Sequence, residues 1–485
     1  MNARLYSYTT GYCAQCGDTV TARIIGEDDA IWQETLCPVH GNSRALVSSN
    51  VDWFDASREY VKPRQIPFAL GADEFRGCPD SCGLCSQHRQ HTCLPVVEIT
   101  HQCNMACPVC LKPAGGEFGM TPDEFRRALA RLIEYEGSVP LLNLSGGEPT
   151  LHPRFAEFLR ICKEMGVIQP SVSTNGLKLR ADPELRALFR ETGTVVSLQF
   201  DGFRPETWQR LRGADFSATR QELIQLLEEE DIRYSLVATV AQGVNDDEIT
   251  AIADFFFASK ALSLMFQPIA FTGVAAAHFD EGARMTIDAV VRELEKSRHI
   301  NAGDFNPLPC AHPGCFSLSY YFQIAEDRFY SLKEFLGKEA FLDVVSNRSL
   351  PGLDKEGHEA IRGRIYECWS AADSIADNRQ VLARIKSILK ELEGRNFSAK
   401  AAFDVGSTVL RSVFIHGFMD ARTFDLGRLM KCCNHYLQPD GRLTPMCSTN
   451  VTGCGAGREV LNAPDPALGN VSLARRFNPL PAPAA

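Results

Sequence analysis

Short apolar runs of strand length alternate with longer amphipathic segments from about residue 94 to residue 270. The apolar runs read LPVVEIT, PLLNLSGG, QPSVSTNG, TVVSLQFDG, YSLVATV and LSLMFQPIA. The segments between them, such as PDEFRRALARLIEYEG and PRFAEFLRICKEMG, repeat apolar residues at helical spacing. Repeated strand–helix units predict a parallel sheet, closed in part into a (β/α)6 TIM-like barrel. Sheets of this kind carry their active sites at the carboxyl ends of the strands.

The pattern changes on either side of this barrel, which we place at residues 95–280. Residues 1–65 hold short alternating segments between cysteine pairs, which predict a small β-rich metal domain of rubredoxin or zinc-ribbon type. Residues 66–94 are rich in cysteine and glycine. Residues 281–470 read as a mostly helical domain with cysteines at both ends, and the Pro/Ala-rich residues 471–485 read as a disordered tail. We therefore expect an α/β protein with three structured parts.

Composition narrows the class of protein. The 485-residue chain is 45% hydrophobic and 23% charged, as is usual for a globular protein, and its net charge is -10. No basic stripe is present, which argues against a nucleic-acid partner. The chain begins without an apolar signal-peptide core and contains no run of 18 apolar residues. We expect a cytoplasmic protein, and a peripheral membrane contact remains open.

The 18 cysteines change the picture most. Disulfides are rare in the cytosol, where closely spaced cysteines more often bind metal or take part in redox chemistry. Cys103, Cys107 and Cys110 form a C-x3-C-x2-C loop directly after the first barrel strand. Three thiolates can hold a [4Fe-4S] cluster and leave one iron open for a ligand. A structural zinc site, or a cluster with a distant fourth ligand, is the competing interpretation.

Polar and glycine residues follow the next three strands in the same layer. They are Gly146, Gly147 and Glu148, then Ser173 and Asn175, then Gln199 and Asp201. Their order after the cysteine loop resembles that of radical S-adenosylmethionine (SAM) enzymes. The resemblance implies that the GGEP segment binds the amino group of SAM, while glycines allow the backbone to approach the ligand. Small polar groups at the third strand could reach the ribose.

Two further cysteine groups precede the barrel. Cys78, Cys82, Cys85 and Cys93 lie within sixteen residues and could fill an auxiliary [4Fe-4S] cluster, or equally a four-cysteine zinc knuckle. Nearer the N-terminus, two knuckles are separated by the spacing of a tetrahedral mononuclear site, for which zinc and iron both remain open. The ligands of this site would be Cys13, Cys16, Cys37 and His40.

The last group lies in the C-terminal region. Cys310 and Cys315 could pair with Cys433 and Cys447 on another auxiliary cluster, and whether Cys432 or Cys433 takes part stays open. The remaining cysteines read most simply as buried and inert. They are Cys162 on an apolar helical face, Cys368 and Cys454.

The run GCPDSCGLCSQHRQHTCLPVVEITHQCNMACPVC resembles the radical SAM family that contains archaeal tetraether lipid synthase, earlier described as pterin-methylating radical SAM proteins. The segments Cys37–Gly41, Pro309–Cys315, Phe418–Asp420, Cys432–His435 and Pro439–Cys447 resemble it too. The resemblance implies three [4Fe-4S] clusters, one mononuclear iron site and radical attack on sp3 carbon. One departure concerns the substrate side of the cluster: Leu111-Lys112-Pro113 stands where the family typically has Phe-Ala.

These observations predict a radical SAM enzyme that binds SAM. The first expectation is C–C bond formation or alkyl modification on a long-chain lipid, which requires a long apolar groove. Radical methylation of a small heterocycle such as a pterin is the alternative and requires a compact polar pocket. A non-catalytic iron–sulfur electron carrier is the third reading. For either enzyme we expect a flavodoxin- or ferredoxin-type reductant as partner.

Overall fold

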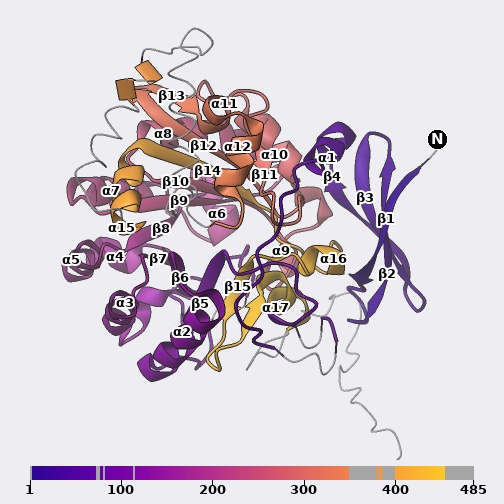
Figure 1. The fold of residues 1–485 in the computed structure, drawn as a ribbon, viewed down its shortest axis with the longest axis horizontal. Helices are drawn as coiled ribbons and strands as arrows, with labels where there is room; N and C mark the ends of the chain where they lie inside the picture. The colour runs from indigo at the N-terminus through magenta and orange to yellow at the C-terminus, as the bar shows by residue number, and fades with distance from the viewer. Residues whose placement is uncertain are drawn as a thin grey trace, which may run out of the picture.

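A computed structural model describes residues 3–72, 77–79, 82–112, 115–348, 380–381, 383–384 and 399–453 (Figure 1). The expected tail and the two cysteines Cys368 and Cys454 lie outside the described residues. Within the described residues, no helix combines the length and the apolar character that crossing a bilayer would need.

A separate antiparallel sheet forms the N-terminal part of the chain. Its strands follow the chain order: β1 (Arg4–Tyr12), β2 (Thr19–Glu27), β3 (Ala30–Cys37) and β4 (Gly41–Ser48). Helix α1 (Val51–Ser57) follows, capped by the side chain of Asn50, which accepts a hydrogen bond from the Trp53 amide at 2.6 Å. The sheet stands at one end of the molecule, beside the barrel (Figure 1).

The barrel strands are neighbours in one large sheet, and each pairs with the next in parallel. They are β5 (Leu94–Thr100), β6 (Leu141–Gly146), β7 (Gln169–Thr174), β8 (Val195–Gln199), β9 (Tyr234–Val240) and β10 (Ser263–Pro268). This confirms the predicted parallel α/β sheet. Alternate residues such as Val97, Leu144 and Val196 are fully buried against the helices, so the residues between them face the barrel interior.

Helices and short 3-10 turns lie between these strands or follow them along the chain, and the longer helices pack on the outer face of the sheet. They are α2 (Pro122–Glu136), η1 (Pro149–Leu151), α3 (Phe155–Glu164), α4 (Leu177–Ala181), α5 (Pro183–Thr192), α6 (Pro205–Arg212), α7 (Ser217–Glu229), η2 (Asp246–Glu248), α8 (Ile249–Ala258), α9 (Ala275–His278), η3 (Glu281–Ala283) and α10 (Ile287–Leu294). The capping box expected at Thr121 starts α2: its hydroxyl accepts from the Glu124 amide, and the Glu124 carboxylate accepts from the Thr121 amide. Cys162 is fully buried on α3.

The described part of the C-terminal region contains strands in addition to the expected helices. Its described residues include helices α11 (Leu332–Leu336), α12 (Lys338–Val345), α15 (Ala399–Val409), α16 (Leu426–Leu429) and α17 (Met446–Thr452). They also include strands β11 (Asn306–Pro307), β12 (Phe316–Ala325), β13 (Arg328–Ser331), β14 (Leu410–His416), β15 (Asn434–Leu437) and β16 (Leu443–Pro445). Strand β14 extends the barrel sheet beyond β10, and β15 extends it beyond β5. The aromatic and β-branched residues of β12 and β14 suit strands better than helices.

Candidate functional site

The cysteine loop after β5 is fixed to its neighbours by backbone hydrogen bonds. The Glu148 amide donates to the Gln102 carbonyl at 2.7 Å, just before Cys103. At the other end of the loop, the Cys110 carbonyl accepts from the amides of Val274 and Ala275 at 3.0 and 3.2 Å. Both ends of the loop are therefore held where the strands β5, β6 and β10 finish.

The three thiols of this loop share one environment. Cys103, Cys107 and Cys110 are each partly exposed. Burial raises the pKa of Cys103, and the negative charges of Glu148 and the other two cysteines raise it further. Thiols gathered in this way are stabilised as thiolates by a bound metal, and three sulfur donors fit a [4Fe-4S] cluster with one open iron.

The two glycines of the GGEP segment permit a close approach to the cysteine loop. A Cβ on Gly146 would lie 2.1 Å from the Thr100 carbonyl oxygen, and one on Gly147 would lie 2.2 Å from the Gln102 carbonyl oxygen. Gly146 also has a φ of +130°, a conformation that favours glycine. Any side chain here would force the second strand away from the cluster loop.

The carboxylate of Glu148 braces two strand ends. It is 1% exposed and accepts hydrogen bonds from the Thr150 hydroxyl at 2.5 Å, the Thr174 hydroxyl at 2.8 Å and the Asn175 amide at 2.7 Å. These donors occupy the carboxylate, so the segment's backbone carbonyls are better placed than Glu148 to receive an ammonium group.

The third strand is tied to the cysteine loop through a residue that the sequence did not single out. Asn175 donates from Nδ2 to Asn104 Oδ1 at 2.7 Å, and Asn104 follows Cys103 directly. Ser173 donates from its hydroxyl to Asn143 Oδ1 at 3.1 Å. Both predicted residues thus lie at this edge of the sheet, and Asn175 contacts the loop itself.

Asp201 and Arg212 form a buried ion pair beside the cluster loop. Arg212 Nε lies 2.7 Å from Asp201 Oδ2, and Gln199 donates from Nε2 to the same oxygen at 2.8 Å. Burial opposes the charge of Arg212, but Asp201 and Cys107 outweigh it and raise the pKa of the guanidinium. The sequence did not predict Arg212 as a site residue, because it lies at the end of helix α6, away from any motif.

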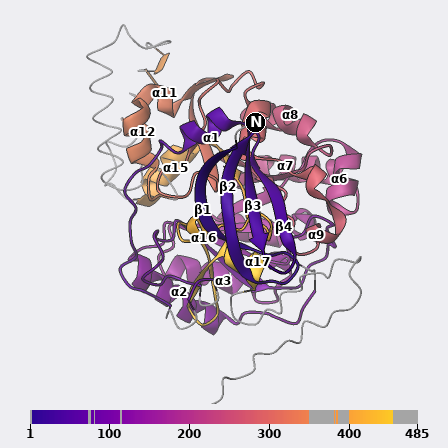
Figure 2. The same ribbon diagram turned by 90° about the vertical axis from the view of Figure 1, so that its right-hand side faces the viewer.

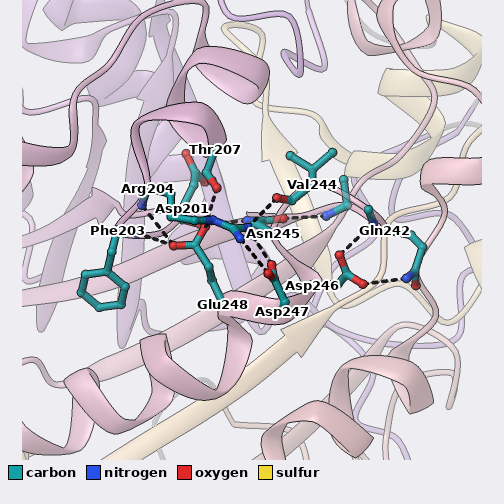
Figure 3. Close-up of polar contacts among 12 residues, drawn as sticks. Asp201, Phe203, Arg204, Thr207, Gln242, Val244, Asn245, Asp246, Asp247 and Glu248 are labelled. Atoms are coloured by element: carbon teal, nitrogen blue, oxygen red, sulfur yellow. Dashed lines mark hydrogen bonds and ion pairs between the residues drawn. The ribbon is translucent and has the colours of Figure 1, made fainter.

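The loop that carries Asp201 is itself rigidly held (Figure 3). The carboxylate of Glu248 accepts from the amides of Phe203 and Arg204 at 2.7 and 3.1 Å. Asn245 donates from Nδ2 to the Asp201 carbonyl at 2.8 Å and to the Thr239 carbonyl at 2.8 Å. The ends of β8 and β9 are therefore locked together under the Asp201–Arg212 pair.

Lys112 returns into the barrel two residues after the cluster loop. Its ammonium forms an ion pair with Glu98 of β5 and lies 4.0 Å from the ring centroid of Tyr436 on β15. Glu98 lies between the core-facing residues Val97 and Ile99 along β5, so its side chain faces the interior. Lys112, one of the positions at which this chain departs from the family that it resembles, thus places a charged pair inside the barrel.

The N-terminal sheet gathers the predicted mononuclear site. The ligand atoms of Cys13, Cys16, Cys37 and His40 lie within 4.8 Å of one another. Cys16 Sγ is 3.9 Å from Cys37 Sγ, and His40 Nδ1 is 3.6 Å from the sulfurs of Cys13 and Cys37. Tetrahedral zinc, with Zn–S near 2.3 Å and Zn–N near 2.0–2.1 Å, implies separations of about 3.8 and 3.6 Å. The four side chains therefore fit one tetrahedral metal ion.

Two other cysteine sites are composed differently from the sequence grouping. The Cys93 thiol is in hydrogen-bond contact with the sulfurs of Cys310 and Cys433. Cys93 and Cys433 directly precede the parallel strands β5 and β15, and the Cys93 amide donates to the Cys433 carbonyl at 2.8 Å. Cys93 thus lies beside two of the C-terminal cysteines.

The second site centres on Cys432. Burial raises the pKa of Cys432, and the negative charges of its neighbours Cys447, Cys315 and Cys82 raise it further. Cys82 and Cys447 also share one buried cluster. Neighbouring side chains in an extended segment point to opposite sides. Cys432 and Cys433 can therefore serve two sites, an outcome that grouping cysteines by sequence proximity could not reveal.

A cavity of about 240 Å³ lies inside the barrel. Its lining includes Cys93, Cys433 and residues at the starts of the strands, such as Leu94, Leu141 and Val195. It therefore lies toward the amino ends of the strands, opposite the Cys103 loop. Most of its lining is apolar; its aliphatic and aromatic side chains include Leu236, Met265, Leu308, Phe316, Leu318, Tyr320, Leu410 and Phe414.

A line of serines crosses the floor of this cavity. Ser197 pairs in register with Ser235, and Ser263 pairs with Ser412. The hydroxyl of Ser263 donates to that of Ser235 at 2.8 Å, which joins the two pairs. All four residues line the cavity. Small side chains at one level of four strands leave room inside a barrel that larger residues would fill.

Comparison with known proteins finds similarity in both the barrel and the N-terminal sheet. Residues 97–256 match the model of the radical SAM superfamily, and residues 5–49 match that of the HMPTM N-terminal zinc ribbon domain. The chain is 26% identical to the 7,8-dihydro-6-hydroxymethylpterin dimethyltransferase of Methanocaldococcus jannaschii, over 91% of this chain and 93% of the relative. It is also 26% identical to the GTP 3′,8-cyclase of Aquifex aeolicus, over 44% and 66% of the two chains. The structure of Streptococcus suis SuiB bound to precursor peptide SuiA superposes with a TM-score of 0.38 at 14% identity, over 43% of this chain and 46% of SuiB.

Proposed function

We propose that the chain is a radical SAM enzyme, on the match of residues 97–256 to the model of that superfamily, and that it activates an sp3 carbon of a long apolar substrate. The outcome would be C–C bond formation or another alkyl modification. With a [4Fe-4S] cluster on Cys103, Cys107 and Cys110 and SAM bound, the site supplies a 5′-deoxyadenosyl radical. The observation that carries the proposed substrate class is the largely apolar cavity within the barrel.

In this proposal, residues at the carboxyl ends of the strands shape the cluster site, and residues at the amino ends hold the substrate. Gly146 and Gly147 bring the strand edge close to the cluster loop, and the Asn175–Asn104 hydrogen bond orients that loop. The charged pairs Asp201–Arg212 and Glu98–Lys112 surround the carboxyl ends of the strands. An apolar chain held in the cavity at the other end would extend toward this polar layer along strands of five to seven residues, about 20 Å.

The remaining cysteines support auxiliary metal centres in this proposal. The tetrahedral set at Cys13 is a zinc or mononuclear iron site. The four sulfurs around Cys432 fit an auxiliary [4Fe-4S] cluster, and the trio Cys93, Cys310 and Cys433 fits another. Cys93 and Cys433 of this trio line the cavity, so a cluster there would lie beside the substrate.

Radical methylation of a small heterocycle is the second candidate. Two observations favour it: the similarity to a pterin dimethyltransferase along nearly the whole chain, and the polar groups Gln199, Asp201 and Arg212 near the cluster loop. Buried donors and acceptors of this kind suit the edges of a heterocyclic ring.

The test is anaerobic reconstitution followed by assay of 5′-deoxyadenosine with a strong reductant. Membrane lipid extracts and a reduced pterin would be added in parallel, with incorporation followed by mass spectrometry. Stimulation of SAM cleavage by the lipid fraction alone, with a mass change in a lipid, supports the first proposal. Stimulation by the pterin alone would replace the lipid proposal with heterocycle methylation. If SAM is not cleaved at all, the protein would instead be a non-catalytic electron carrier.

A further inference from the structure

Arg428 is a buried cation directly beside the sulfur site around Cys432. Its Nε donates to Cys315 Sγ at 3.1 Å, and its Nη2 donates to the Gly417 carbonyl. An arginine guanidinium keeps its positive charge at every pH that a folded protein experiences. One side-chain hydrogen bond of Arg428 thus goes to a sulfur and the other to a carbonyl, whereas buried arginines usually pair with carboxylates.

The guanidinium is held in place from the N-terminal sheet. Asp425 caps α16 by accepting from the Arg428 amide at 3.2 Å, and the Thr9 hydroxyl of β1 donates to the same Asp425 oxygen at 2.6 Å. Strand β1 and helix α16 lie side by side in Figures 1 and 2. The position of Arg428 is therefore fixed on both sides.

The other auxiliary site has a different electrostatic environment. The Cys310 sulfur accepts from the backbone amide of Asn347 at 3.1 Å, and the Cys93 sulfur from the neutral side-chain amide of Gln90 at 3.9 Å. His91 Nε2 also lies 3.6 Å from the Cys93 sulfur, and His91 Nδ1 lies 3.0 Å from the Glu136 carboxylate. The neighbours of this site are therefore two neutral amides and an imidazole paired with a carboxylate, and none of them is a guanidinium. A full positive charge next to a cluster sulfur stabilises added negative charge more strongly than a neutral amide does.

From this contrast we infer that Arg428 is a positioning residue that raises the reduction potential of the cluster held by Cys82, Cys315, Cys432 and Cys447. One-electron reduction of that cluster adds one negative charge, which the guanidinium stabilises. No bond breaks, and the electron comes from a flavodoxin- or ferredoxin-type reductant. The inference rests on the proposed auxiliary cluster. It makes this site the more easily reduced of the two and hence the place where an electron collects.

The experiment is an anaerobic redox titration of the reconstituted full-length protein, followed by electron paramagnetic resonance. The transition that disappears in Cys447→Ser identifies the cluster. In Arg428→Gln we expect its reduced-to-oxidised ratio at fixed potential to fall at least tenfold, which is 59 mV for one electron. Arg428→Lys keeps the charge but loses the planar Nε donor, so its shift should be smaller.

Arg422→Gln is the matched control, since Arg422 lies on the neighbouring turn, is half exposed and points to Glu281 at 3.6 Å. Its titration should follow the wild type. A threefold or smaller change in Arg428→Gln, with iron content intact, overturns the inference. If Arg428→Gln loses iron, Arg428→Lys decides instead: a fall in the ratio of tenfold or more despite the retained charge overturns the inference, and a smaller fall supports it. Should Cys447→Ser remove no transition, the cluster itself is absent and the inference falls with it, while SAM cleavage at Cys103 reports separately on the enzyme.

Discussion

Single charged residues decide what the interior of this barrel can bind. Lys112 and Glu98 form a pair whose side chains are only 22% and 13% exposed. Arg212 and Asp201 form a second pair, 12% and 0% exposed. Charges this deep are stable because each has its partner. They also make the cluster end of the barrel polar, whereas the opposite end is apolar.

Lys112→Met should destabilise the protein by about 3 kcal/mol, because it leaves the Glu98 carboxylate without its cation in the interior. The melting temperature of the anaerobic holoprotein measures this. The double variant Lys112→Met, Glu98→Gln should recover most of the loss. Arg154→Gln, which breaks an exposed pair with Glu157, is the control and should cost less than about 0.5 kcal/mol. A loss equal to that of the control would show that Lys112 is not buried with Glu98.

His416 at the end of β14 should make stability depend on pH. Burial lowers its pKa to about 3, and its ring stacks on Phe316 with a centroid distance of 4.0 Å. A histidine buried in its neutral form contributes stability that is present above its unfolded pKa of about 6.5 and is lost as the pH falls toward 3. The loss is about 1.4 kcal/mol per pH unit across that range.

His416→Phe removes this titration and keeps an aromatic ring in place. Between pH 7 and pH 4.5, the melting temperature of the wild type should therefore fall relative to that of the variant. Parallel curves for the two proteins would mean that His416 titrates normally.

At the scale of elements, the N-terminal sheet packs against the C-terminal region and holds it by hydrogen bonds. Gln33 of β3 donates from Nε2 to the Phe424 carbonyl at 2.7 Å, and the Thr9 hydroxyl bonds Asp425. Tyr12 packs in one cluster with Phe424 and Cys447. The metal site of the sheet, at the β1–β2 and β3–β4 turns, therefore stabilises the segment that carries Arg428.

Removing the metal from the Cys13 site should loosen α16. In Cys16→Ser, which deletes one of the four ligands, we expect amide hydrogen exchange of residues 424–429 to accelerate at least tenfold, because the docking sheet loses its metal staple. Strand β8, which lies in the barrel, is the internal reference and should exchange as in the wild type. Unchanged exchange at 424–429 would show that the sheet docks without its metal.

At the scale of the whole molecule, the sequence predicts the repeated strand–helix units. It does not predict contacts between segments that lie far apart in the chain. The strand–helix alternation identified β5–β10, and the motif order placed the Cys103 loop at their carboxyl ends. The edge strands β12, β14 and β15 were not predicted, because they are surrounded in the sequence by segments whose apolar residues recur at helical spacing. The regrouping of Cys93 with Cys310 and Cys433 depends on tertiary pairing of β5 with β15, which local spacing does not encode. Arg212 and Arg428 sit on helices without motifs and become significant only beside the sulfurs.

The cavity at the amino ends of the strands yields the sharpest test of the proposed substrate class. Ser235→Leu places a branched side chain on the serine line, where the structure leaves room at one level of four strands. If a long apolar chain occupies that space, turnover of the lipid substrate should fall at least tenfold with the longest chains most affected. Substrate-independent cleavage of SAM should remain within twofold, because the Cys103 loop lies at the other end of the barrel. Ser43→Leu, on the exposed face of β4, is the control for an added leucine. A variant that processes long and short chains as the wild type does would place the substrate elsewhere and favour a compact ligand at the polar layer near Asp201 and Arg212.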